Sequence, residues 1–177
     1  MSTAKKAPAR KAPAKKSASS AQPAARKASA QPDATALLKA DHQRVAGLFE
    51  DFEKATTKAR KASIVASICQ ELTVHAQLEE EIFYPAVKAA LKDHELVPEA
   101  TVEHATVKDL IAAVQGQAPG DEMYDARVTV MSEYVKHHVK EEEKQMFVQA
   151  RKTDLDLRAL GAQMAARKQE LLAQTAP

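Results

Sequence analysis

The sequence predicts an all-α fold, namely an up-down-up-down antiparallel four-helix bundle with an extra C-terminal helix and a disordered basic N-terminal tail. After Pro32, apolar residues recur every three or four positions through most of the chain. The chain has only four glycines, and alternating apolar and polar runs are too short for strands. Long helices joined by short turns must be antiparallel neighbours, because a short connection cannot return the chain to the other end of the domain.

Five helices are predicted in order along the chain. Asp33 is expected to cap the first helix, Pro85 to bend the second near its end, and Gly116 to end the third. We expect three parts in total: a tail over 1–32, the bundle over 33–152 and a C-terminal helix within 153–177. The predicted helices span residues 34–56, 58–91, 98–115, 121–151 and 155–174.

Residues 1–32 differ in composition from the rest of the chain. They contain eight of the 26 Lys and Arg residues, no acid, and no Leu, Ile, Val, Phe, Tyr or Trp. We expect disorder, because this segment cannot offset its ordering entropy by burying apolar surface. Its KKAPARKAPAKK repeat resembles the basic tails of histone H1-like proteins, which predicts weak nucleic-acid or polyanion binding. A solubilising extension and a transit peptide are the alternatives, although the latter would need large apolar residues for an amphipathic face.

The remaining totals indicate the cellular setting. A single cysteine, Cys69, excludes an internal disulfide framework. No apolar run resembles a signal peptide or reaches the roughly 20 residues of a membrane-spanning helix. We therefore expect a cytoplasmic protein with no membrane partner.

The second half of the bundle repeats polar residues of the first. HAQLEEEIFYP at 75–85 and HVKEEEKQMFV at 138–148 both place a glutamate four residues after a histidine, and each stretch follows a helix with an inward histidine. The offset is 62 residues for one matched pair and 63 for the other two. The matched pairs are His42 with His104, His75 with His138, and Glu79 with Glu142.

These six residues interrupt apolar helix faces, which points to a metal centre. Positions i and i+4 of a helix lie about 40° apart around the axis and roughly 6 Å along it, so each His–Glu pair can face one point. Unpaired imidazoles and carboxylates would cost several kcal/mol there, and a cation removes that cost. Two carboxylates and four imidazoles suit two metals with an oxo or hydroxo bridge, since a closed zinc site needs only four ligands.

The phrases DHQRVAGLF, HAQLEEEIFYP, EHATVKDLI and HHVKEEE resemble the hemerythrin-like HHE cation-binding family over about residues 34–150. The resemblance implies a non-haem di-iron centre in a four-helix bundle. It implies His42, His75, His104 and His138 as terminal ligands and Glu79 and Glu142 as bridges.

Two departures from the oxygen-carrying hemerythrins stand out. Those proteins have a fifth histidine one turn after the third ligand, where this chain has Lys108. They also place the last carboxylate five residues after its histidine, a position occupied by Glu143, so Glu142 and Glu143 remain alternatives as the second bridge. The resemblance therefore implies binding, sensing or reaction with oxygen, nitric oxide or peroxide, as in a stress response, rather than reversible oxygen carriage.

Several neighbouring side chains receive other roles. His137 is expected at the surface or behind a ligand, and Glu80 or Glu143 could accept a proton from a ligand histidine. Asp41 and Glu103 precede ligands but point about 100° away, so neither is expected to bind metal. Tyr84 and Phe147, at matched places, are expected to close the bundle. His94 is expected in a solvent-facing turn.

Three functions remain open on the sequence alone. The first is a di-iron protein that binds or senses a small diatomic or peroxide species. The second is an oxidoreductase that consumes peroxide or nitric oxide at the same centre. The third is a DNA- or polyanion-associated helical protein that acts through its basic tail.

Overall fold

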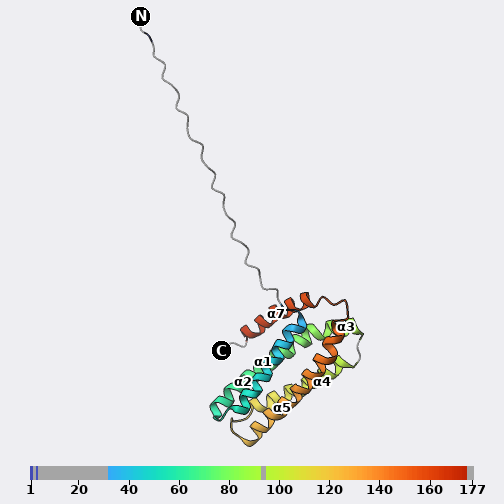
Figure 1. The fold of residues 1–177 in the computed structure, drawn as a ribbon. Coiled ribbons are helices and arrows are strands. Elements are labelled where there is room, and N and C mark those ends of the chain that lie inside the picture. Colours follow the sequence, from blue (N-terminus) through green and yellow to red (C-terminus); the bar gives the residue numbers. More distant parts are fainter. Residues whose placement is uncertain (2, 4–31, 93–94, 175–177) are drawn as a thin grey trace.

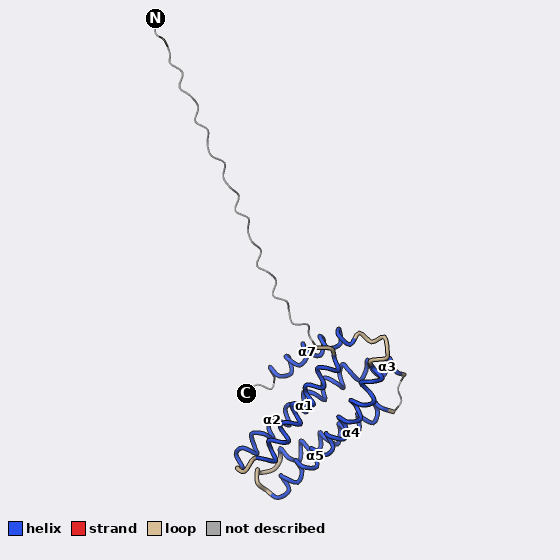
Figure 2. The backbone as a smooth tube through the Cα atoms, viewed as in Figure 1, coloured by secondary structure: helices blue, strands red, loops and turns tan. Residues whose placement is uncertain are grey.

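The computed structural model describes residues 1, 3, 32–92 and 95–174, and these contain helices and no strands (Figure 1). The four bundle helices run antiparallel in chain order, and a last helix lies along the outside (Figures 1 and 2). This confirms the predicted all-α bundle with an extra C-terminal helix. The elements are α1 (Ala34–Lys54), α2 (Lys58–Leu78), η1 (Glu79–Phe83), α3 (Tyr84–Leu91), α4 (Leu96–Gln115), α5 (Glu122–Glu141), η2 (Glu142–Met146), α6 (Phe147–Ala150) and α7 (Leu157–Gln174).

The helix ends follow local capping chemistry. The Asp33 carboxylate accepts a hydrogen bond from the amide of Ala36, which confirms it as the N-cap of α1. Thr57 and Asp121 cap α2 and α5 in the same way. Gly116 directly follows α4, as predicted. The expected tail disorder and the placement of His94 concern residues outside the described part of the chain.

The sequence did not indicate two π-helical turns. The second helix of each pair widens into a π turn at a glutamate that is a candidate metal ligand. The turn η1 follows α2 and begins at Glu79, and η2 follows α5 and begins at Glu142. The amide of Tyr84 bonds the carbonyl of Glu79, and the amide of Phe147 bonds that of Glu142. Pro85 follows only the first of these turns, so proline is not their common cause. Single π turns inside α-helices often mark functional sites.

The apolar core has two parts. One cluster packs around Leu38, Phe83 and Phe147, near the end of the bundle where α1 begins. The other packs around Phe49, Ile68 and Met131, toward the opposite end. All six repeated histidines and glutamates are buried, and His42, His104, His138 and Glu142 lie in sequence between residues of the two clusters. They form what we call the polar layer: His42, His75, Glu79, His104, His138 and Glu142.

Helix α7 packs against α1, α2 and η1, on one side of the bundle (Figure 1). Met164 and Leu171 are buried on its inner face. Gly161 allows a close crossing, since a Cβ there would lie 2.5 Å from the carbonyl oxygen of Pro32 and 2.7 Å from the amide nitrogen of Ala34. The helix is therefore seated firmly on the start of α1.

Within residues 32–92 and 95–174, each helix is too short or too polar to cross a lipid bilayer.

Candidate metal centre

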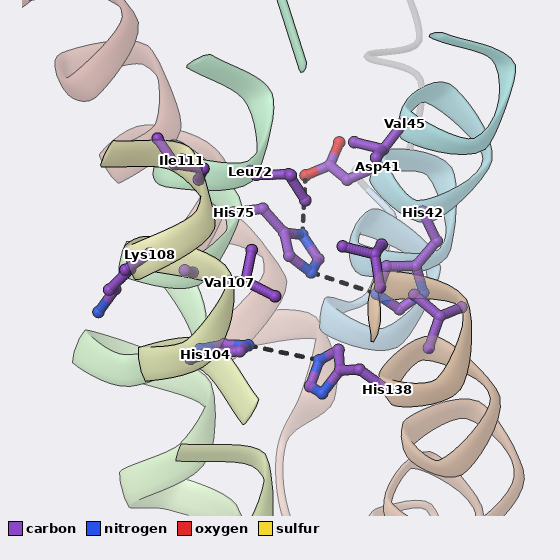
Figure 3. Close-up of a pocket in the computed structure, with 13 residues that line it drawn as sticks. Asp41, His42, Val45, Leu72, His75, His104, Val107, Lys108, Ile111 and His138 are labelled. Atoms are coloured by element: carbon purple, nitrogen blue, oxygen red, sulfur yellow. Dashed lines mark hydrogen bonds and ion pairs between the residues drawn. The ribbon is translucent and has the colours of Figure 1, made fainter. Parts of the chain in front are cut away.

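The structure brings together all six residues that the sequence singled out. His42 comes from α1, His75 from α2, His104 from α4 and His138 from α5, while the two glutamates begin the π turns that follow α2 and α5. The Nε2 atoms of His42 and His75 lie 3.2 Å apart, and those of His104 and His138 lie 3.3 Å apart (Figure 3). Two donors bound at right angles about 2.1 Å from one octahedral ion would lie about 3 Å apart, so each histidine pair fits one cation.

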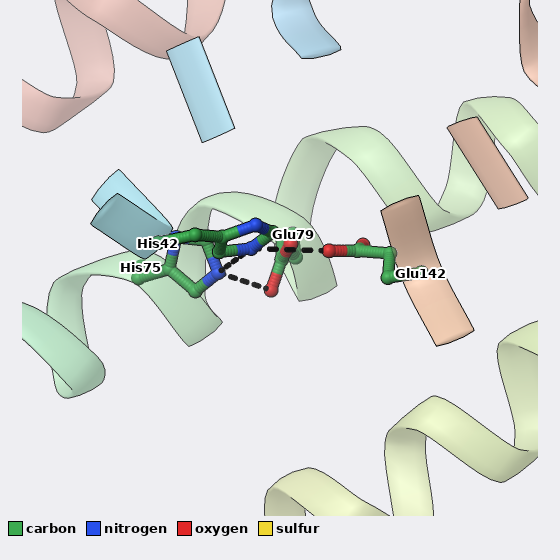
Figure 4. A group of neighbouring side chains, drawn as sticks. All are labelled: His42, His75, Glu79 and Glu142. Atoms are coloured by element: carbon green, nitrogen blue, oxygen red, sulfur yellow. Dashed lines mark hydrogen bonds and ion pairs between the residues drawn. The ribbon is translucent and has the colours of Figure 1, made fainter. Parts of the chain in front are cut away.

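The carboxylate of Glu79 lies between the two histidine pairs. Its Oε2 is 3.1 Å from Nε2 of His75 and 3.2 Å from Nε2 of His104. Glu142 approaches the first pair, with Oε2 3.3 Å from Nε2 of His42 (Figure 4). Two groups of ligand atoms result, which share Glu79: His42, His75, Glu79 and Glu142 in one, and Glu79, His104 and His138 in the other.

The alternative between Glu142 and Glu143 has a clear geometric answer. The Glu142 side chain is 1% exposed and faces the polar layer, whereas Glu143 is 29% exposed and lies behind His42. The Oε1 atom of Glu143 accepts a hydrogen bond from Nδ1 of His42 at 2.9 Å. Glu142 is therefore the inward carboxylate of this half.

Each histidine of the layer has a carboxylate behind it. Glu80 lies 3.0 Å from Nδ1 of His104, and Glu103 lies 2.8 Å from Nδ1 of His138. Because an ionised carboxylate can only accept, Nδ1 carries the proton in these hydrogen bonds and in that of His42. The distance from the fourth histidine to its carboxylate is longer, since Oδ2 of Asp41 lies 3.8 Å from Nδ1 of His75. Carboxylates in this position orient metal-binding imidazoles and raise their basicity.

Asp41 and Glu103 thus have a role that the sequence analysis missed. As expected, neither carboxylate points into the polar layer. Instead, Asp41 on α1 faces His75 on α2, and Glu103 on α4 faces His138 on α5. Their matched positions, 62 residues apart, were the available signal. A partner on another helix cannot be inferred from spacing within one helix.

The layer holds more acceptors than donors. With Nδ1 protonated, the Nε2 atoms of His42, His104 and His138 present lone pairs to one another and to the glutamates. Three buried carboxylate oxygens, Oε1 of Glu79 and both oxygens of Glu142, have no hydrogen-bond partner among the described residues. Buried acceptors without donors are costly, and a cation satisfies several at once. The donor set therefore fits metal ions.

The electrostatics of the two glutamates agree with this interpretation. Burial raises the pKa of Glu142 to about 7, and the charge of Glu79 adds to the rise. Burial also opposes ionisation of Glu79, but in the absence of a metal the charge of a protonated His75 and a proton on Nε2 of His104 would hold the pKa of Glu79 well below its usual range. Two carboxylates this close are fully ionised together only when positive charge accompanies them.

Tyr84 contributes a seventh polar atom to the layer. Its hydroxyl lies 3.2 Å from Nε2 of His104 and 3.5 Å from Oε2 of Glu79. At the matched position, Phe147 instead stacks on the ring of His42, with centroids 5.9 Å apart. The expectation that both aromatic residues only close the bundle therefore holds for Phe147, whereas the Tyr84 hydroxyl could also bind a metal.

A small cavity adjoins the histidines on the side away from the glutamates. Its volume is about 30 Å³, and its walls include the four histidines with Val45, Leu72, Val107 and Ile111 (Figure 3). This exceeds the roughly 10–15 Å³ that one water needs. Lys108 lines the outer edge, and its ammonium pairs with Glu80 at 2.6 Å rather than with the histidines. The cavity suits a small uncharged molecule.

The chain resembles known proteins over most of its length. Residues 33–150 match the family model described as hemerythrin HHE cation binding domain. A crystal structure of an HHE cation binding domain-containing protein from Mycobacterium kansasii superposes with a TM-score of 0.70 and 26% identity, covering 81% of this chain and 89% of that one.

Curated relatives include proteins with and without an assigned activity. An uncharacterized protein of Mycobacterium tuberculosis is 28% identical over 142 residues, covering 76% of this chain and 84% of the relative. A protein of Nostoc sp. named DNA nickase is 26% identical over 115 residues, covering 65% of this chain but only 32% of that relative. Since the family model covers well over half of the chain, and the histidines and glutamates of the bundle meet at one buried cluster, this protein belongs to the hemerythrin HHE cation-binding domain family.

Proposed function

We propose that the polar layer binds two non-haem iron ions and that the protein binds, senses or reacts with oxygen, nitric oxide or peroxide there. His42 and His75 would serve one ion, and His104 and His138 the other. Glu79 would be the main bridging carboxylate, and Glu142, which lies nearer the first ion, the second and weaker bridge. The observation that carries the proposal is the excess of buried acceptors: converging imidazole lone pairs and three carboxylate oxygens without donors.

The donor types favour iron over the alternatives. Imidazole and carboxylate ligands with no thiolate suit iron, and two ligand groups that share Glu79 suit a pair of ions rather than one closed tetrahedral site. Bound iron would supply redox chemistry towards small oxidants.

The protein's own groups would select and hold the small molecule. The mainly apolar walls of the adjoining cavity favour an uncharged ligand of two or a few atoms and keep bulk water from the histidines. The carboxylates behind the rings fix which nitrogen faces inward. Lys108 has no lone pair while protonated and is held outward by Glu80, so it does not complete the coordination.

Metal analysis of the full-length chain tests this proposal. We expect two iron ions per chain after growth or reconstitution with excess iron. The reduced protein should oxidise quickly in air instead of forming a long-lived oxygen adduct, and the oxidised protein should consume hydrogen peroxide. One zinc ion and no iron would contradict iron binding, while two irons with an oxygen adduct stable for many minutes would support a carrier.

A second candidate function rests on the charge of residues 1–32. Their eight cationic residues and absence of acids predict weak, sequence-independent nucleic-acid binding that decreases steeply with salt. The relative named DNA nickase is compatible with this idea, but the present chain spans about a third of that protein. Deleting residues 1–32 should abolish retention on DNA at low salt and leave metal content unchanged. A full-length protein that is not retained would leave the tail without this role.

A further inference from the structure

The C-terminal helix α7 touches the polar layer through one residue. The ammonium of Lys168 forms an ion pair with Oδ1 of Asp41. The other oxygen of Asp41, Oδ2, is the one that faces Nδ1 of His75, at 3.8 Å. A chain of contacts therefore runs from α7 through Asp41 to a histidine of the layer, although residues 33–150, which match the family model, do not include α7.

The Asp41 end of this contact chain is buried, and the Lys168 end is half-buried. Asp41 is 7% exposed, and the Lys168 side chain is 18% exposed. An ammonium that loses most of its hydration needs a close anion, and a buried carboxylate needs a cation. The pair thus fixes the orientation of the Asp41 carboxylate more tightly than a surface ion pair would.

His75 has a longer contact with its carboxylate than the other three histidines have with theirs, so a small displacement of Asp41 would change it most. Its Nδ1 is buried and has no hydrogen-bond partner among the described residues, and Asp41 Oδ2 is likewise unsatisfied. For the other three histidines a hydrogen bond of 2.8–3.0 Å fixes the proton on Nδ1. For His75 only the position of Asp41 favours that arrangement.

We propose that Lys168 is a positioning residue of the metal centre, which holds Asp41 so that His75 keeps its proton on Nδ1 and offers Nε2 to the metal. This inference rests on the proposed metal binding. Without Lys168, Asp41 turns toward the water admitted at the vacated side chain. The proton of His75 then shifts to Nε2, where it competes with the metal.

The opposite half lacks such a helix. Within residues 32–92 and 95–174, Glu103, which matches Asp41, forms no ion pair with a Lys or Arg and instead has the exposed His137 nearby, with Nε2 3.6 Å from its Oε1. Loss of Lys168 should therefore lower the affinity for the ion beside His42 and His75 and leave unchanged the affinity for the ion beside His104 and His138. A helix that merely stabilised the bundle would affect both ions alike.

The test uses the full-length, iron-loaded protein and stepwise removal of iron by a chelator under anaerobic conditions. Replacing the partner of a metal-binding histidine costs about 10–100-fold in metal affinity, so Lys168→Met should weaken one of the two ions by about 10-fold. Lys168→Arg should restore most of the affinity, because it keeps the cation. Asp41→Asn should weaken the same ion, and the double variant should be no worse than Asp41→Asn alone.

Arg167→Met is the matched control. Arg167 neighbours Lys168 on α7 and pairs with Glu81 at 2.8 Å, so it also holds the helix to η1. Its ion pairs within the described part of the chain are with Glu81 and Glu170 and do not involve the polar layer. It should lower the melting temperature and leave both iron-release steps unchanged. The inference would be overturned if Lys168→Met and the wild type released iron equally, or if Lys168→Met and Arg167→Met lost the same iron affinity. A wild-type chain without iron would instead overturn the proposed function itself, and with it this inference.

Discussion

The two halves of the bundle, residues 34–91 and 96–150, share the polar residues that face the layer but differ in the residues next to them. The first half has Tyr84, whose hydroxyl faces the layer, where the second has Phe147, whose ring only packs. The first also has a lysine from α7 behind Asp41, whereas Glu103 has an exposed histidine. The repeat thus preserves the groups that could bind metal, and the surroundings would give the two proposed metal positions different properties.

The largest effect should come from the group that both halves share. Glu79 lies within reach of both histidine pairs, whereas Glu142 belongs to the group of His42 and His75 only. Glu79→Ala should therefore remove nearly all iron, and Glu142→Ala should leave at least one ion per chain. Elemental analysis checks this, with His137→Ala as the control that keeps both ions. Equal losses from the two glutamate variants would show that both carboxylates bridge to the same degree.

Removing the metal should lower the melting temperature, because the metal would join the two halves of the bundle, but each helix pair should stay folded. At a free metal concentration about 100 times the dissociation constant, binding stabilises a protein by about 2.7 kcal/mol. For a domain of this size that corresponds to a fall of roughly 5–10 °C in melting temperature on metal removal. Far-ultraviolet circular dichroism should show nearly unchanged helix content below the transition, because both apolar clusters remain. Equal melting temperatures would mean that the layer satisfies itself without metal.

Exchanging the matched aromatic residues should alter the spectrum more than the stability. Tyr84→Phe removes one buried hydroxyl at a cost of about 1 kcal/mol, and Phe147 shows that a phenyl ring is tolerated at the equivalent place. We expect two irons to remain bound. An absorption band from the phenol oxygen to oxidised iron should be present in the wild type and absent from Tyr84→Phe. Identical spectra would place the Tyr84 hydroxyl outside the coordination.

The smallest effect concerns Cys69, whose place in the second half is taken by Ser132. Burial raises the pKa of the Cys69 thiol to about 11. A pKa two units above that of a free thiol lowers the thiolate fraction near pH 8 by about 100-fold. Iodoacetamide should therefore label the native protein at least that much more slowly than the unfolded chain. The stability from the neutral thiol is present below the unfolded pKa near 9 and is lost as the pH rises toward 11. Fast labelling of the native protein would contradict this burial.

The helical spacing of apolar residues was sufficient to predict the fold and the residues that face the bundle interior. Apolar spacing predicted the bundle helices, and the interruptions by His42, His75 and their counterparts predicted which side chains meet, because helix geometry depends on local sequence. The π turns at Glu79 and Glu142 were missed because they change the backbone without a distinct residue pattern. The contacts of Tyr84 and Lys168 were missed because each joins residues that are close only after the helices pack.

The polar layer also restricts how the helices can be aligned. Apolar stripes alone tolerate sliding of one helix by a turn of about 5.4 Å, since one buried Leu or Val can replace another. With a polar layer between the two apolar clusters, such a slide would place a histidine among residues such as Phe49 and Ile68 and set an aliphatic side chain against Glu79. The charged cross-section therefore selects one alignment from several that hydrophobic packing alone would leave nearly equal in free energy.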